Sequence, residues 1–357
     1  MKSRLILLAK FTLAAGLIYW LIASDKLDFE DLRAIDTRWP WLIGAYALFG
    51  LVLFLGAIRW RLFLDAQEIR YSLREAYALT MIGFFFSQVM LGSTGGDMVK
   101  AYVVAREQRG RRSAALMTVI FDRVFGLLIL LVVALGAIAF NFDLVRADAE
   151  LAGFAITVGV VLTGALAACA CFYSERIRTA KWVRVTVRRV PFQGFLSNFI
   201  LALDAYKRRP RPIAQAAAIS VVLHVLVILS VVCAAKALIA GPVSIAHFFF
   251  LIPLAHIAMA LPLTPGSIGT GEAAYAFLLG RVGITQGSLV SLLMRLVYLG
   301  WAVIGCAFYL QRKTKVSSAV QEARSTSGGS PVPDERASDS EQSRTTRRGN
   351  SSGMVQA

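Results

Sequence analysis

Apolar runs close to the length needed to cross a bilayer recur along most of the chain. A transmembrane helix needs roughly 20 consecutive apolar residues. With 57% apolar and only 17% charged residues in a chain of 357, the composition is far too apolar for a soluble domain. Backbone polar groups inside lipid find no water, so each spanning segment must satisfy them internally. The sequence therefore predicts an all-α polytopic membrane protein.

Six of these runs are predicted to cross the membrane as helices. They cover residues 5–23, 41–58, 116–140, 151–173, 213–238 and 288–310. The first run could be confused with a cleaved signal peptide. It is long, contains Lys10 and is followed by no small-residue cleavage pattern, so we interpret it as a retained helix.

Two further apolar runs are interrupted by glycine-rich stretches. The first interruption is Gly92-Ser93-Thr94-Gly95-Gly96-Asp97, and the second is Thr264-Pro265-Gly266-Ser267-Ile268-Gly269-Thr270-Gly271-Glu272. Lipid-exposed backbone cannot be broken at membrane depth, so such a break must be buried in protein or line a wet cavity. Paired breaks in the two halves of a membrane protein are typical of a transport site between repeats. Ordinary loops at the membrane surface are the alternative.

The charges that flank the interrupted runs indicate re-entrant hairpins. Basic residues lie on both sides of the first run, within 59–74 and 100–112. A crossing there would place one basic segment outside, against the positive-inside rule. Similarly, segment 247–280 must return to the outer side if Arg312 and Lys313 are cytoplasmic. We expect two Gly-rich re-entrant hairpins from opposite faces of the cell (inner) membrane, as in an inverted repeat, with both termini cytoplasmic.

The formal charge of +16 lies in the loops and the C-terminal residues. We expect a transmembrane domain over residues 1–312 and a disordered cytoplasmic tail over 313–357, which is rich in Ser, Thr, Arg and Gly. The basic cytoplasmic segment 174–212 also carries apolar patches. That mixture favours interfacial helices on an anionic leaflet, with a solvated loop as the alternative. No DNA-binding motif is present, so no nucleic-acid partner is expected.

Five ionisable residues fall within or beside the apolar runs. Asp122 and Arg123 lie in the third crossing segment, Arg295 lies in the last, and Asp97 and Glu272 end the two glycine-rich breaks. Intramembrane charges are costly and are functional candidates. Neighbouring residues of a helix point about 100° apart, so Asp122 and Arg123 should pair with different helices. The charges would form either a polar cavity for a lipid head group or structural ion pairs that fix the helix register.

The candidate lipid head-group site is larger than these five charges. It comprises Gly92, Ser93, Thr94, Gly95, Gly96, Asp97, Lys100, Asp122, Arg123, Gly266, Ser267, Gly269, Glu272 and Arg295. Guanidinium groups bind phosphate in a bidentate manner, and glycine N–H groups at a helix start add anion contacts. No nucleophile elbow, P-loop or metal-ligand spacing is found, so we expect no catalytic residue, no metal and no cofactor.

Three motifs follow one another in a recognisable order. They are Gly92-Ser93-Thr94-Gly95-Gly96-Asp97 with Lys100, Tyr102 and Arg106, then Asp122-Arg123 with Gly126, then Leu261-Pro262 with Gly266, Gly269 and Glu272-Ala273-Ala274. Together they resemble the transmembrane domain of lysylphosphatidylglycerol synthases, over roughly residues 5–312. In those synthases this domain is thought to move an aminoacylated lipid between leaflets, whereas a separate soluble domain makes that lipid. The resemblance thus implies a standalone, flippase-like member without the aminoacyltransferase domain.

The resemblance leaves the cargo open, because similar proteins are tied to polyprenyl-linked sugars and to hopanoids. The expected partners are a membrane phospholipid or a polyprenyl or hopanoid lipid, together with a lipid-synthesis enzyme. One departure is Thr270-Gly271 before Glu272, where relatives often carry Arg-Glu, so Glu272 is not expected to have a local partner. The alternative functions are a membrane-embedded transferase or accessory subunit acting on a polyprenyl-linked sugar or phospholipid, with Asp97 or Glu272 as general base, and a scaffold for a partner enzyme.

Overall fold

The computed structural model describes Tyr19 and residues 35–89, 95–108, 110–173, 193–260, 264 and 267–312. These residues contain eleven helices and no strand. They belong to a single compact unit, Met1–Val316. The expected first crossing helix, the basic residues 174–192 and the expected tail 313–357 lie outside the described residues, apart from Tyr19.

Five helices are long and apolar enough to cross a membrane. They are α2 (Ile35–Ala66), α5 (Arg112–Phe140), α7 (Ala149–Tyr173), α11 (Pro210–Leu238) and α14 (Gly287–Gln311). Each corresponds to one of the predicted crossing segments, and the all-α polytopic membrane fold is confirmed. The predicted end of the second segment at residue 58 is wrong, because α2 continues to Ala66. Its Arg59 and Trp60 point into the protein and do not mark a membrane surface.

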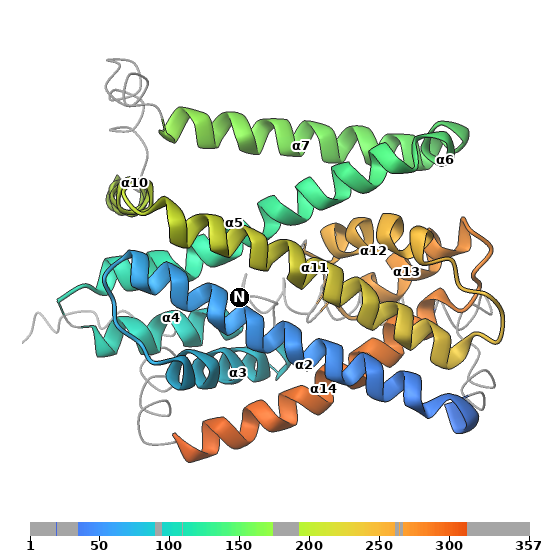
Figure 1. The fold of residues 1–357 in the computed structure, drawn as a ribbon, viewed down its shortest axis with the longest axis horizontal. Helices are drawn as coiled ribbons and strands as arrows, with labels where there is room; N and C mark the ends of the chain where they lie inside the picture. The colour runs from blue at the N-terminus through green and yellow to red at the C-terminus, as the bar shows by residue number, and fades with distance from the viewer. Residues whose placement is uncertain are drawn as a thin grey trace, which may run out of the picture. The chain divides into compact units, whose positions relative to one another are not determined.

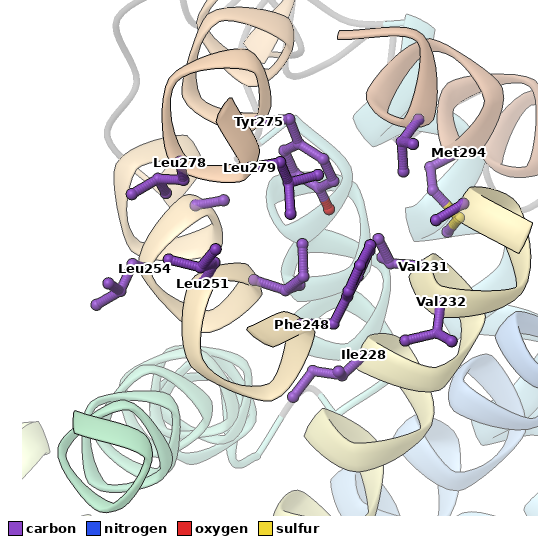
Figure 2. Close-up of a cluster of buried hydrophobic side chains, with 14 of the residues drawn as sticks. Ile228, Val231, Val232, Phe248, Leu251, Leu254, Tyr275, Leu278, Leu279 and Met294 are labelled. Carbon is purple, nitrogen blue, oxygen red and sulfur yellow. The ribbon is translucent and has the colours of Figure 1, made fainter. Parts of the chain in front are cut away.

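Both interrupted runs form pairs of packed helices. The first pair is α3 (Leu73–Val89) and α4 (Gly95–Glu107), and the second is α12 (Ile245–Ala260) and α13 (Thr270–Gly280). The Tyr71 hydroxyl, just before α3, donates to the Glu107 carboxylate at the end of α4. In the second pair, Phe248 near the start of α12 and Leu279 near the end of α13 share one buried cluster, shown in Figure 2. In each pair the chain therefore leaves where it entered, as a hairpin does.

The two hairpins open toward opposite ends of the bundle. We call the end where α5 begins the basic end, because Arg111, Arg112, Arg208, Arg209 and Arg211 lie there. We call the end reached after α5 the acidic end, because Asp143, Asp148 and Glu150 lie there.

Ion pairs assign each hairpin to one of these ends. At the basic end, Arg111 contacts Gln67 and Glu68 in the turn before α3. At the acidic end, Arg281 follows α13 and binds Asp148 and Glu150 on either side of the start of α7. Figure 1 shows the α3–α4 and α12–α13 pairs at opposite ends of the long helices.

The order of elements repeats within the chain. A long helix, a hairpin and a second long helix occur first as α2, α3–α4 and α5, and again as α11, α12–α13 and α14. The two leading helices, α2 and α11, pack along each other (Figure 1). The last helix of each repeat packs on the first hairpin helix of the other, α14 on α3 and α5 on α12. Two units that exchange equivalent contacts while their hairpins point in opposite directions have the arrangement of inverted repeats.

A shorter helix, α10 (Gln193–Lys207), lies within the segment for which interfacial helices were predicted. Its Phe199 ring stacks on Phe121 of α5, and its Tyr206 meets the same ring edge-on. Leu201, about 200° around the helix from Phe199, is exposed on the other side. Aromatic packing thus holds one face of α10 against the bundle and leaves apolar side chains on another. Its placement on a membrane leaflet stays a prediction.

Candidate functional site

The predicted site residues gather in two groups, one for each hairpin. Gly95, Gly96, Asp97 and Lys100 of α4 lie with Asp122 and Arg123 of α5. Ser267, Gly269 and Glu272, at the start of α13, lie with Arg295 of α14. Gly92, Ser93, Thr94 and Gly266 are outside the described residues.

In the first group, a close approach of backbones fixes the start of α4. A Cβ atom at Gly96 would lie 1.8 Å from the Gly83 carbonyl oxygen and 2.2 Å from Ser87 Oγ, both on α3. Glycine at position 96 is therefore a packing requirement. It holds the positive end of the α4 dipole against α3, and Asp97 occupies the first turn of that helix, where a carboxylate is favoured.

Asp97 forms an ion pair between the hairpin and the helix that follows it. Its Oδ2 atom contacts Nε of Arg123 on α5. The Arg123 side chain is 57% exposed at the surface of the protein, and the Asp97 side chain is 22% exposed. Arg123 is about 16 Å along α5 from its start, at 1.5 Å per residue, and its neighbours Val124 and Leu127 are also exposed. A partly exposed arginine side chain thus lies well inside a helix of membrane-spanning length.

The adjacent carboxylate points elsewhere, as the helical geometry predicted. Asp122 accepts a hydrogen bond of 2.9 Å from Nε of Arg59 on α2, and both side chains are largely buried. Arg59 also donates to Ser220 Oγ of α11 at 3.1 Å. One buried cluster therefore links α2, α5 and α11. The sequence interpretation missed Arg59, although apolar residues continue beyond it through Leu62, a sign that the helix does not end there.

Lys100 lies beside this cluster and is only 6% exposed. Its ammonium group is 3.7 Å from the centroid of the Trp60 ring, a cation–π contact. The ring is fixed in turn, since Trp60 Nε1 donates to Thr118 Oγ1 at 3.3 Å. Among the residues that the structure describes, Lys100 has this aromatic partner but no carboxylate within salt-bridge distance.

The second group is closed by several bonds. Glu272 Oε2 accepts a hydrogen bond of 2.7 Å from the Gly269 N–H, and Oε1 accepts one of 2.9 Å from Arg295 Nε. Arg295 also donates to the Ser267 carbonyl at 3.2 Å. The side chains of Arg295 and Glu272 are 17% and 5% exposed. Glu272 therefore finds its base on α14 and not in the local sequence, where no local partner was expected.

The loop before α13 is held by its own polar groups. Ser267 and Gly269 adopt left-handed backbone conformations, with φ of 57° and 81°. Ser267 Oγ donates to the Met259 carbonyl at 2.9 Å, and the hydroxyls of Thr264 and Thr270 lie 3.0 Å apart. The described residues of this loop are thus tied by hydrogen bonds within the protein, as polar groups at membrane depth require.

The two groups share one plan. In each, the acid is the third residue of the second hairpin helix, and its arginine lies on the next long helix. Sequence reasoning selected all four residues but not the pairing. Among the described residues, no group of three or more His, Cys, Asp or Glu could hold a metal ion. These residues can therefore recognise a ligand through ionic contacts and hydrogen bonds. We call the Asp97–Arg123 pair open, because its arginine is exposed, and the Glu272–Arg295 pair closed, because both side chains are buried.

Comparison with known proteins identifies one family. The family model described as the lysylphosphatidylglycerol synthase TM region matches residues 7–305, a range that includes both hairpins and both ion pairs. No curated protein and no solved structure matches the chain.

Proposed function

Because this chain belongs to the lysylphosphatidylglycerol synthase transmembrane-region family, we propose that it binds a lipid head group at Arg123 and moves it between the leaflets. The observation that carries the proposal is the open Asp97–Arg123 pair, whose arginine side chain is more than half exposed on an apolar helix of membrane-spanning length. Charge at such a position is costly unless it meets a polar ligand or water.

The surroundings of Arg123 suit a lipid better than a fully water-soluble solute. Val124 and Leu127 on α5 and Met98 on α4 are exposed beside the ion pair. A phosphate in contact with the guanidinium would keep its acyl chains against such apolar side chains. Arginine can hold a phosphate through two parallel hydrogen bonds.

The inverted repeats supply a means of exposing the site alternately. Rocking of one repeat against the other around a central contact is the usual mechanism of transporters built in this way. Here α2 and α11 form the central contact, and each repeat carries one hairpin and one acid–arginine pair. In this proposal the head group passes between the two repeats while its tails remain in lipid.

The charge of the two ends supports an orientation. The basic end carries the arginines that begin α5 and α11, and the end of α14 lies there because Phe308 packs against Tyr77 of α3. The positive-inside rule places such an end in the cytoplasm. We therefore propose a multi-pass protein of the cell membrane with the basic end, and with it the C-terminus, in the cytoplasm.

A head-group accessibility assay in proteoliposomes tests the proposed function. Wild-type protein should speed the exchange of a labelled lipid between leaflets, and Arg123→Ala should reduce the rate by about tenfold or more, because a desolvated charge contact is lost. Arg112→Ala is the matched control, since it removes an exposed arginine from the start of the same helix. Equal rates in wild type and Arg123→Ala, or no exchange by any candidate lipid, would refute the proposal.

The transferase alternative makes a different demand on the same residues. It needs Asp97 or Glu272 to accept a proton from a substrate hydroxyl. Both carboxylates contact arginine side chains, which occupy oxygens that would do so. Mass spectrometry of membrane lipids separates the two functions: a transferase creates a new lipid on expression, whereas a translocator changes only its distribution.

A further inference from the structure

The ionisable groups around the start of α4 do not balance. Arg59, Lys100 and Arg123 are cationic, whereas Asp97 and Asp122 are the two carboxylates that contact them or lie beside them. Asp122 is bound by Arg59 and Asp97 by Arg123. Three cations and two carboxylates leave one positive charge in excess, and among the described residues Lys100 is the cation of this group without a carboxylate in salt-bridge contact.

The second hairpin provides an internal reference. Its pair, Glu272 and Arg295, is neutral as a unit and closed, with each side chain at least four-fifths buried. Burial of an ion pair in the membrane region is tolerable when the charges cancel, whereas an excess charge carries a large desolvation cost. Of the two acid–arginine pairs, the excess positive charge lies beside Asp97 and Arg123, the pair that is exposed enough for a ligand to reach.

Arg123 has donors left for such a ligand. Its contact with Asp97 is made through Nε, and a guanidinium carries two further amino groups that can grip a phosphate together. Lys100 stands one helical turn beyond Asp97 on α4 and is held in place by the Trp60 ring. It need not touch the ligand, because a charge in a poorly solvated environment acts over several ångströms.

We propose that the head group bound at Arg123 carries net negative charge, and that Lys100 supplies the matching excess of positive charge. The inference rests on the proposed function, because it names the class of lipid that the same site accepts. It favours anionic phosphate-bearing head groups over zwitterionic ones and over cationic head groups that carry no phosphate. An anionic lipid head group and a free phosphate ester both present a phosphate to Arg123. An experiment must therefore distinguish a lipid ligand from a soluble one.

Binding can be measured apart from translocation. The full chain in neutral detergent is titrated with phosphatidylglycerol, phosphatidylcholine and a cationic trimethylammonium lipid of the same acyl chains, and the midpoint of thermal unfolding gives an apparent affinity. We expect phosphatidylglycerol to bind about tenfold more tightly than phosphatidylcholine, because one uncancelled charge within several ångströms attracts the anionic head group. The cationic lipid should not stabilise the protein. Glycerol phosphate, tested alone, should stabilise it far less than phosphatidylglycerol.

Three variants separate this site from the general charge of the protein. Lys100→Met keeps the aliphatic packing on Trp60, and Arg123→Gln changes an exposed side chain, so both should fold. Each should reduce the preference for phosphatidylglycerol to less than about threefold, since each removes a charge near the ligand. Arg112→Gln removes the same charge from the exposed start of α5 and should leave the preference unchanged. Arg123→Lys keeps the charge and should retain most of it.

The outcomes decide the proposal. Equal binding of anionic and zwitterionic lipids, or a preference that survives in both Lys100→Met and Arg123→Gln, would overturn it. If glycerol phosphate binds as tightly as phosphatidylglycerol, the ligand is not specifically a lipid, and the site accepts free phosphate esters. If the protein exchanges anionic and zwitterionic lipids between leaflets at equal rates in proteoliposomes, this inference is wrong and the proposed function still holds. If the protein binds phosphatidylglycerol selectively but exchanges no lipid between leaflets, the proposed translocation is wrong and the charge preference of the site still holds.

Discussion

The two hairpins of this protein have the same plan but different exposure. In α12–α13, Glu272 and Arg295 are buried, and the loop between the helices is closed on itself by hydrogen bonds. In α3–α4, the equivalent pair of Asp97 and Arg123 lies at the surface of the bundle. Inverted repeats allow one copy of a motif to keep a structural duty while the other is left open for a ligand. The comparison indicates that the acid–arginine pair belongs to the fold. Under the proposed function, the exposed copy of the pair is the one that binds the ligand.

The largest stability effect is expected at the closed pair. Glu272→Ala leaves Arg295 buried without its carboxylate and frees the Gly269 N–H, so it should reduce the free energy of unfolding by about 3–5 kcal/mol. Thermal unfolding in detergent measures the change. The double variant Glu272→Gln with Arg295→Met should recover part of the loss, because no buried charge remains. A loss below 1 kcal/mol for Glu272→Ala would mean that the closed pair is not structural.

The glycines at the second position of each second hairpin helix give a matched pair of substitutions. At Gly96 a new Cβ would meet the Gly83 backbone oxygen at 1.8 Å, whereas at Gly271 it would meet the flexible end of Met259 at 3.2 Å. Gly96→Ala should therefore cost about 1–3 kcal/mol by overpacking. Gly271→Ala should cost less than that, since a methionine side chain adapts.

The same unfolding measurement compares these two variants directly. Equal losses would show that α3 and α4 can separate as easily as α12 and α13 can repack. That result would contradict a rigid backbone contact beneath the open pair.

The sequence carried much of this architecture. Long apolar runs identified the five long helices that the structure describes, and the glycine-rich breaks with flanking charges identified both hairpins. Position alone also singled out Asp97, Arg123, Glu272 and Arg295, because charge is rare in such segments. These features are local, so they can be read from residues that are neighbours in the chain.

What the sequence did not predict depends on contacts between helices. The partner of Glu272 is on α14, and the partner of Asp122 is Arg59, which had been interpreted as the end of a helix. The exposure of Arg123 and the burial of Arg295 also depend on which neighbouring helix covers each side chain. No local pattern distinguishes Arg123 from Arg295, because each lies in an apolar helix whose sequence does not show which neighbouring helix covers the side chain.

At the open end of the first hairpin, Tyr71 provides a smaller test. Burial, reinforced by the hydrogen bond to Glu107, raises the pKa of the Tyr71 hydroxyl. Tyr71→Phe should cost about 1–2 kcal/mol at neutral pH, as expected for a hydrogen bond to a carboxylate. The protonated phenol stabilises the fold fully below its unfolded pKa of about 10. Stability should therefore decline in wild type at higher pH, as the unfolded chain ionises first.

Unfolding midpoints of wild type and Tyr71→Phe between neutral pH and pH 11 measure this difference. The two curves should converge at the alkaline end. Parallel curves throughout would show that Tyr71 does not hold the ends of α3 and α4 together.

The smallest stability effect is expected at the open pair, and it separates the two hairpins most sharply. Arg123→Gln removes a side chain that is more than half exposed, so breaking its ion pair should cost less stability than breaking the buried pair at Arg295. Asp97 is left at the positive end of the α4 dipole, where its charge is still favoured. The variant should thus unfold within a few degrees of wild type and yet lose lipid exchange. Arg295→Gln should show the opposite pattern: it should destabilise the protein strongly, and any loss of lipid exchange should follow from that loss of stability. If Arg123→Gln is as unstable as Arg295→Gln, the two pairs have the same structural duty, and exposure does not mark the functional copy.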